Sequence, residues 1–279
     1  MTPIVSASWL RSYDEKSAEP LRIVDVRWYL RDRSGRDEYA RGHIPGAVFV
    51  DLEHEITAPA GPGRHPIPTK DQLTLAMRRA GVSASTHVVA YDDADGSIAA
   101  RLWWLLRKHG HARVSVLDGG LKAWVAAGGP LATEVPSVEE GTFTALPLPP
   151  SAIVDKGAVD RARRDPTTRI LDARARERYR GDIEPVDARP GHIPGAKSAP
   201  FSENVDGGTF RAPTELREHY ARLGAIDAKE LIVYCGSGVT ACHDLLALEL
   251  AGITGAKLYE GSWSDWARDE ILPAALGDD

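Results

Sequence analysis

The feature that most restricts the possible folds of this chain is an internal repeat. Four motifs of the first half return in the second half, in the same order and at a spacing of roughly 145 residues, which indicates a tandem duplication. The chain is therefore expected to hold two copies of one fold. The pairs are "RIVDVR" (22–27) with "RILDAR" (169–174), "RGHIPGAVF" (41–49) with "PGHIPGAKS" (190–198), "HVVAYDDADG" (87–96) with "LIVYCGSG" (231–238), and "VLDGGLKAW" (116–124) with "LYEGSWSDW" (258–266).

Each half alternates short apolar runs with helical patterns. The runs are nearly continuous in apolar residues and bounded by turn residues, as in parallel strands that are covered on both faces. The helical patterns at 69–81 and 212–224 start at Thr or Pro, and all four patterns close on Gly. This alternation predicts an α/β fold in which each half is a mainly parallel sheet flanked by helices. The runs lie at 22–26, 87–91, 113–117, 169–173, 230–234 and 256–260, and the helical patterns at 69–81, 97–110, 212–224 and 239–252.

A stretch rich in Pro, Gly and Glu separates the two halves. It has no sustained periodicity and is typical of a surface linker. We place an N-terminal domain at 1–128, the linker at 129–152 and a C-terminal domain at 153–279.

Composition excludes several classes of protein. With 43% hydrophobic and 27% charged residues the chain is typical of globular proteins, and a net charge of −6 gives no sign of a nucleic-acid or anionic-membrane partner. No apolar run approaches the roughly 18–20 residues of a membrane span, and the N-terminus has no targeting pattern. The two cysteines are too few for a disulfide framework, so we expect a cytoplasmic protein.

Both cysteines lie in "YCGSGVTACH", at 234–243. Cys235 directly follows a predicted strand, at the sheet edge where α/β proteins place their chemistry. Gly236 and Gly238 allow the backbone to curl so that several N–H groups face inward, and the following helix adds positive potential. Such a setting favours the thiolate, so Cys235 is predicted to be a nucleophile.

Cys242 lies in the helix that follows and is expected to be a small hydrophobic core residue. Two alternatives remain open for it. One is a resolving thiol that pairs with Cys235 under oxidation, and the other is a metal site with Cys235 and His243, which lacks both ligand spacing and a fourth ligand.

Through these motifs the sequence resembles the two-domain rhodanese-type sulfurtransferases, which include thiosulfate sulfurtransferase and 3-mercaptopyruvate sulfurtransferase. The resemblance runs over essentially the whole chain, through "SASWL", both "GHIPGA" motifs, "RLWWLLRKHGH", "LDGGLKAW", "CGSGVTACH" and "EGSWSDW". It implies two rhodanese domains, of which only the C-terminal one is active. Asp92 replaces the cysteine in the first half, and a carboxylate cannot accept sulfane sulfur.

The resemblance implies that Cys235 takes a sulfur atom from a small anionic donor as a persulfide. Backbone N–H groups of Gly236, Gly238, Val239 and Thr240 would bind its charge. A thiophilic acceptor, such as cyanide, thioredoxin or another reduced thiol, would then remove the sulfur. No metal or organic cofactor is implied, and the sequence gives no indication of oligomeric state.

The donor follows from the two residues after the cysteine. Relatives that favour thiosulfate carry an Arg and a Lys there, whereas this chain has Gly236 and Ser237, as in the 3-mercaptopyruvate branch. We therefore expect 3-mercaptopyruvate as the preferred donor and thiosulfate as the alternative.

In the 3-mercaptopyruvate branch, the serine works with a His and an Asp of the N-terminal domain. The resemblance maps these roles to Ser237, His43 and Asp32, with Asp37 as a second choice for the Asp. For His43 a structural role stays open, because "GHIPGA" also occurs around His192 and could simply brace a turn.

The resemblance also implies cations for the donor carboxylate. Arg178 aligns with the substrate-binding arginine of the family, and an arginine fork suits a carboxylate. The second arginine is expected near position 187, where this chain has Asp187, so Arg189 is the nearest candidate. Arg174, like Arg27 in the first half, is expected to pair within the fold.

Two rival functions are less favoured. A cysteine phosphatase needs Cys-x5-Arg to clamp phosphate, but Ala241 stands at the arginine position. A non-catalytic persulfide carrier would keep the Cys235 loop but turn over only with a dedicated partner protein.

Overall fold

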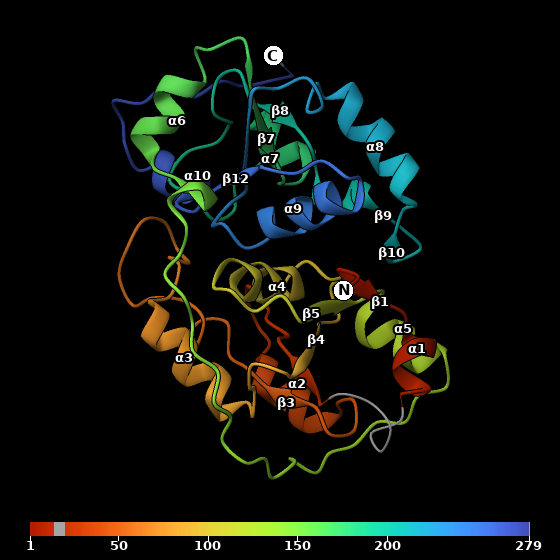
Figure 1. The fold of residues 1–279 in the computed structure, drawn as a ribbon. Coiled ribbons are helices and arrows are strands. Elements are labelled where there is room, and N and C mark those ends of the chain that lie inside the picture. The colour runs from red at the N-terminus through yellow and green to blue at the C-terminus, as the bar shows by residue number, and fades with distance from the viewer. Residues whose placement is uncertain (14–19, 279) are drawn as a thin grey trace. The chain divides into compact units, whose positions relative to one another are not determined.

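The computed structural model describes residues 1–13 and 20–278 and divides the chain into two compact units (Figure 1). The first unit comprises 1–58, 68–148 and 207–209, and the second comprises 59–67, 149–206 and 210–279. Residues 59–67 precede the linker in sequence, but by their contacts they belong to the second unit.

The first unit contains a five-stranded sheet in the order β1-β5-β4-β2-β3, and its neighbouring strands run parallel. All residues of the central strand β4 are buried, as the continuous apolar run predicts. The strands are β1 (Ile4–Val5), β2 (Leu21–Asp25), β3 (Val48–Phe49), β4 (His87–Tyr91) and β5 (Val114–Leu117), and the helices are α1 (Ala7–Arg11), α2 (Gly35–Arg41), α3 (Lys70–Arg79), α4 (Ala99–Lys108) and α5 (Gly120–Ala126).

The second unit repeats this arrangement, with a five-stranded parallel sheet in the order β6-β12-β11-β7-β8. Its strands are β6 (Ile153–Val154), β7 (Thr168–Asp172), β8 (Lys197–Ser198), β11 (Glu230–Tyr234) and β12 (Lys257–Tyr259). Its helices are α6 (Lys156–Ala162), α7 (Arg176–Arg180), α8 (Pro213–Arg222), α9 (Ala241–Leu250) and α10 (Ser262–Trp266), with short 3-10 turns η1 (Pro150–Ala152) and η2 (Phe201–Asn204). A two-stranded hairpin, β9 (Val205–Asp206) and β10 (Thr209–Phe210), completes the elements. The predicted α/β class and the duplicated parallel sheet are confirmed.

Helix starts follow the local chemistry that the sequence suggests. The side chain of Thr69 accepts a hydrogen bond of 3.1 Å from Gln72 N at the start of α3. The helix then buries Leu73, Ala76 and Met77 on one face.

Each unit contains the same buried ion pair beside its central strand. Arg174 lies 2.6 Å from Asp172 in the second unit, and Arg27 lies 2.7 Å from Asp25 in the first. The guanidinium also donates to a backbone carbonyl, at Gly191 and Gly42 respectively. These contacts confirm that Arg174 and Arg27 pair within the fold. Because both partners are buried, removing either one would leave an uncompensated charge in the core.

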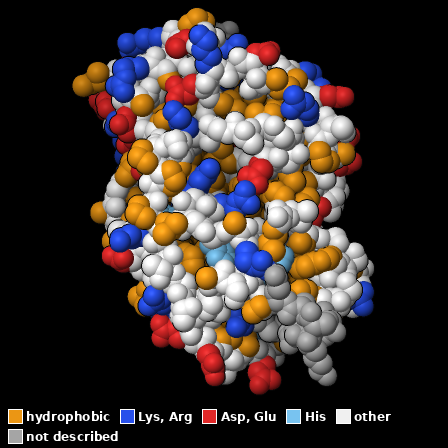
Figure 2. All heavy atoms as spheres, in the orientation of Figure 1, with side chains coloured by type: hydrophobic (Ala, Val, Ile, Leu, Met, Phe, Trp, Pro, Cys, Tyr) orange, Lys and Arg blue, Asp and Glu red, His pale blue; other side chains and the backbone are white. Residues whose placement is uncertain are grey.

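No helix in the described part of the chain is both long and apolar enough to cross a membrane. On the face drawn in Figure 2, basic and acidic side chains are interspersed among apolar ones.

Candidate active site

Cys235 lies at the carboxyl end of β11, where the chain turns toward α9, and its side chain is 1% exposed. Hydrogen bonds to residues at the start of α10 fix this turn. Cys235 N donates to Ser262 Oγ at 3.1 Å, and Cys235 O accepts from Trp263 N at 2.9 Å. Gly236 O accepts in turn from Ser264 N at 2.9 Å. These three hydrogen bonds anchor the loop to the start of α10.

The loop directs a backbone N–H at the sulfur atom. Gly238 N donates to Cys235 Sγ at 3.1 Å. Gly238 has a φ of +80°, and a β-carbon there would lie 2.6 Å from Glu260 O. Glycine is required at this position both for the left-handed backbone and for the close approach.

Cys242 has a separate role in the loop. It is fully buried in α9, and its thiol donates to Gly238 O at 3.4 Å. Neither cysteine forms a disulfide bond. His243 stacks on Phe210 at 4.5 Å, and among the described residues no cluster of His, Cys, Asp and Glu has the arrangement of a metal site.

Ser237 contacts a histidine that the sequence analysis did not identify. Ser237 Oγ lies 2.7 Å from Nδ1 of His65, and both residues are buried. His65 comes from residues 59–67, which pack against the loop before α10. Ile67 N donates to Glu260 Oε2 at 3.1 Å, and Arg64 N donates to Ser264 Oγ at 3.1 Å. In the sequence, His65 is distinguished only by its place in a Pro- and Gly-rich stretch that has no counterpart in the repeat.

The same segment brings a second arginine close to Cys235. A β-carbon on Gly236 would lie 2.9 Å from Arg64 Nη2 and 3.4 Å from Arg178 Nη1. Both guanidiniums pair with Asp187, one at each carboxylate oxygen, at 2.9 Å for Arg178. Arg178 also pairs with Glu184 at 2.7 Å.

The pKa values of the two carboxyl groups in this cluster shift in opposite directions. Burial raises the pKa of Asp187 above its ordinary value, although Arg64 and Arg178 oppose that rise. Burial acts in the same direction on Glu184, but hydrogen bonds from Asp187 N and Arg178 hold the pKa of Glu184 below its ordinary value.

The guanidinium of Arg189 binds backbone carbonyl oxygens near α10. Its Nη2 donates to the carbonyl oxygens of Trp266, Asp269 and Leu272, at 3.3, 2.9 and 2.7 Å. These carbonyls lie at and beyond the end of α10, so Arg189 caps the helix end.

His43 and His192 occupy equivalent places in the two units. His43 is fully buried and stacks on Tyr39 at 3.9 Å, and its Nδ1 lies 2.8 Å from Tyr39 O. His192 stacks on Tyr179 at 3.7 Å, with its Nδ1 2.9 Å from Tyr179 O. Since both units keep the same contacts, this histidine braces the "GHIPGA" turn. The second ring nitrogen of His43 lies 3.1 Å from Glu134 O.

The proposed acidic partner Asp32 lies in the first unit. It is exposed, with a φ of +61° in the turn before α2. Asp37 lies in the first turn of α2, where its N donates to Ser34 Oγ at 3.2 Å.

In the first unit, Asp92 stands in the loop at the position that matches Cys235. Asp92 is fully buried, and its carboxylate accepts four backbone hydrogen bonds of 2.8–2.9 Å, from Ala94, Gly96, Ile98 and Ala99. Burial raises the pKa of Asp92, and these four N–H groups act against that rise. The loop thus folds around an anionic group that is part of its own chain.

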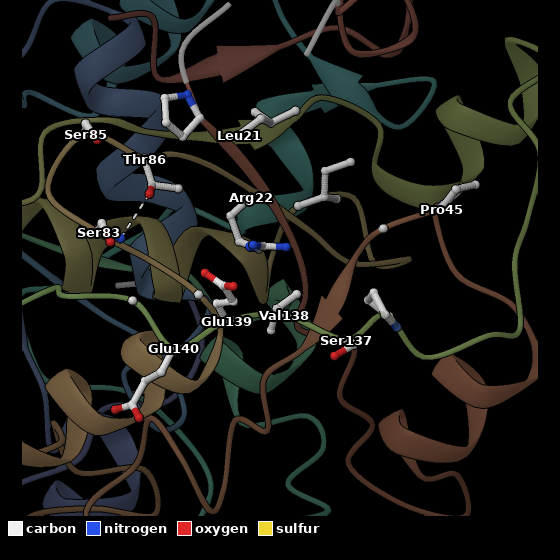
Figure 3. A pocket seen from close by; sticks show the side chains of 16 residues that line it. Leu21, Arg22, Pro45, Ser83, Ser85, Thr86, Ser137, Val138, Glu139 and Glu140 are labelled. Carbon is white, nitrogen blue, oxygen red and sulfur yellow. Dashed lines mark hydrogen bonds between the residues drawn. The ribbon is translucent and has the colours of Figure 1, made fainter. Parts of the chain in front are cut away.

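A cavity in the first unit lacks this chemistry. It has a volume of about 570 Å³ and lies at the amino ends of β2 and β4, at the opposite edge of the sheet from Asp92 (Figure 3). Arg22, Ser83, Thr86 and Glu139 line it, but no cysteine does. It is therefore separate from the candidate active site.

Comparison with known proteins agrees with the geometry. The rhodanese-like domain family matches residues 6–127 and 155–269. The 3-mercaptopyruvate sulfurtransferase of Escherichia coli K12 is 36% identical over 98% of this chain and 97% of its own length. A Pseudomonas aeruginosa protein with the provisional name 3-mercaptopyruvate sulfurtransferase is 44% identical over 94% of both chains. A Mycobacterium tuberculosis protein with the provisional name thiosulfate sulfurtransferase SseB is 41% identical over 94% of this chain and 93% of its own.

Among solved structures, the crystal structure of SseA from Escherichia coli matches with a TM-score of 0.83 at 36% identity. The match covers 95% of this chain and 100% of that chain. Sequence and fold therefore agree over nearly the whole length, and this chain belongs to the rhodanese family, with two rhodanese-like domains in tandem.

Proposed function

We propose that this protein is a sulfurtransferase that carries sulfane sulfur on Cys235 as a persulfide. One observation carries the proposal. Cys235 is buried directly after β11, and its sulfur atom accepts a hydrogen bond from Gly238 N at 3.1 Å. An N–H donor at this distance stabilises negative charge on sulfur. The names of the relatives, 3-mercaptopyruvate and thiosulfate sulfurtransferases, support the same activity.

The reaction with 3-mercaptopyruvate is a transfer of one sulfur atom. The Cys235 thiolate attacks the thiol sulfur of the donor, and a new S–S bond forms while the donor C–S bond breaks. The electron pair of that bond remains on carbon as the enolate of pyruvate, which takes up a proton. The persulfide S–H loses its proton, so the products are pyruvate and an anionic Cys–S–S⁻.

The Asp92 loop of the first unit supports an anion-binding role for its counterpart. Both loops lead from the central strand into a helix through a left-handed glycine, Gly96 at φ +85° and Gly238 at φ +80°. In the Asp92 loop the inward N–H groups bind a carboxylate. Around Cys235, the N–H groups of Gly236, Gly238, Val239 and Thr240 are proposed to bind the terminal sulfur.

Ser237 and His65 are proposed to handle the proton. Their side chains share a hydrogen bond of 2.7 Å two residues beyond Cys235. A proton held between them can pass through the Ser237 hydroxyl to the enolate carbon as the C–S bond breaks. His65 takes the place that the sequence analysis assigned to His43, whose ring contacts brace a turn instead. The role of Asp32 is left as a prediction from the resemblance.

We propose 3-mercaptopyruvate as the preferred donor because Gly236 and Ser237 place no cationic side chain directly after Cys235. A reduced thiol such as thioredoxin is proposed as the acceptor, in the cytoplasm. Parallel measurement of kcat/KM for both donors, with cyanide as acceptor, tests the donor preference. A value ten times higher for thiosulfate would overturn it and leave sulfur transfer intact.

Mass spectrometry tests the persulfide itself. Protein treated with donor and no acceptor is expected to gain one sulfur atom on the peptide that contains Cys235, and Cys235→Ser is expected to abolish both that gain and turnover. Turnover by a protein whose Cys235 stays unmodified would refute the proposal. A persulfide that forms but never reaches cyanide or a small thiol would indicate a carrier protein.

A further inference from the structure

Two guanidinium groups meet above Gly236, the residue next to the nucleophile. The nearer atoms are Arg64 Nη2 and Arg178 Nη1, which a β-carbon on Gly236 would approach to 2.9 and 3.4 Å. Neither atom makes a hydrogen bond within the described part of the chain, and the Nε atoms of both arginines are buried without a partner. Each side chain is partly exposed, at 23% and 18%. The protein therefore leaves hydrogen-bond donors of both groups unused beside Cys235.

Asp187 holds the two cations together. Each of its carboxylate oxygens pairs with one guanidinium, and its side chain is only 3% exposed. Like charges this close would repel each other without such a partner. The negative charge that Asp187 supplies comes from the position at which the family resemblance implies an arginine.

We infer that Arg64 is the second donor-binding cation of this protein and forms, with Arg178, the site for the carboxylate of the donor. This assignment rests on the proposed sulfur transfer. Asp187, at the position where the resemblance implies an arginine, pairs with Arg64 and positions it. Arg189 cannot serve, because its guanidinium binds the carbonyl oxygens beyond α10. Two N–H donors from separate arginines suit the two oxygens of a carboxylate.

The charge of the cluster favours a monoanionic donor. Arg64 and Arg178 carry two positive charges, and Asp187 and Glu184 carry two negative ones, so the four side chains are balanced. A 2-keto acid with one carboxylate adds one negative charge, whereas thiosulfate adds two. The cluster therefore selects for a mercapto keto acid over a dianion.

The test compares Arg64→Gln with wild type on two donors, 3-mercaptopyruvate and its neutral amide. For the keto acid, loss of one charge-assisted contact should raise KM roughly 10- to 100-fold, with a smaller change in kcat. For the amide, KM should change little, because no carboxylate is lost. Arg64→Lys should recover part of the loss, since it keeps the charge but not the fork. Arg176→Gln, on an exposed arginine of the same unit, is the matched control and should behave as wild type.

Equal losses on the keto acid and the amide would show that Arg64 acts only through structure, and no loss on either donor would remove it from the site; both results overturn the inference. A wild type that forms no persulfide with any donor would instead refute the proposed function, and this assignment with it. Asp187→Asn supplies an independent measurement. It leaves a net positive charge near Gly236, so KM for thiosulfate should fall, and an unchanged value would refute the charge argument.

Discussion

Replacing Gly238 with alanine should disable the loop that binds the sulfur. Gly238 has a φ of +80°, where a residue with a β-carbon costs about 1–2 kcal/mol. The new β-carbon would also lie 2.6 Å from Glu260 O, well inside the ordinary contact distance of about 3.5 Å. The backbone must therefore shift, and the hydrogen bond from Gly238 N to Cys235 Sγ, 3.1 Å long, lengthens or breaks.

The size of the effect follows from that hydrogen bond. A hydrogen bond to a charged group contributes about 1.5–3 kcal/mol. Lost from the thiolate and the persulfide, it corresponds to roughly a 10- to 100-fold slower persulfide formation. Single-turnover release of pyruvate from 3-mercaptopyruvate, followed with enzyme in excess, measures this step. Urea denaturation of the same variant should report the backbone strain and the steric contact together.

Gly252→Ala separates the effect of backbone strain from the effect of the steric contact with Glu260 O. Gly252 has a φ of +72°, just beyond α9, and a β-carbon there meets nothing within 4 Å. This variant should lose only about 1–2 kcal/mol of stability and keep the wild-type rate. If Gly238→Ala forms the persulfide within about twofold of wild type, the N–H of Gly238 does not stabilise the sulfur and the reasoning fails.

Two further predictions concern other residues. Cys242→Ser should keep most of the activity, because the hydroxyl can still donate to Gly238 O; steady-state turnover as low as in Cys235→Ser would contradict the separate roles of the two cysteines. Burial, with a smaller contribution from His111, lowers the pKa of His87 from its ordinary 6.5 to about 4. Between pH 6.5 and about pH 4, His87 is therefore protonated in the unfolded chain but neutral in the folded chain. The free energy of unfolding falls as the pH falls through that window. Urea midpoints between pH 7 and about 4 should show this decline and a shallower one in His87→Gln, and equal slopes would refute it.

The sequence predicted the fold well because the relevant signals are local. Runs such as 87–91 and 230–234 are apolar after their first residue, and they form the central strands β4 and β11 of the two sheets. The candidate nucleophile was also readable, since Cys235, Gly236 and Gly238 are consecutive or nearly so. The strand end and the turn are visible in this order of residues, whereas hydrogen bonds from α10 fix the loop in the folded chain.

Two residues that reach the site from a distance, Arg64 and His65, were not predicted. The "GHIPGA" motif drew attention to His43, but its ring contacts Tyr39, only four residues away, and repeats the brace of His192. His65 and Arg64 lie about 170 residues before the loop they approach, in a stretch with no repeat to align. Nothing in their immediate neighbours indicates that the stretch packs against α10.

By itself the sequence determined that this chain is a duplicated α/β protein with a candidate nucleophilic cysteine at a strand end. Only the tertiary structure decided which charged and proton-bearing side chains surround that cysteine. The reason is physical: strand and loop conformations arise from short-range backbone preferences and apolar periodicity. The meeting of Arg64, His65 and Asp187 depends instead on packing between segments that the chain brings together only when it folds.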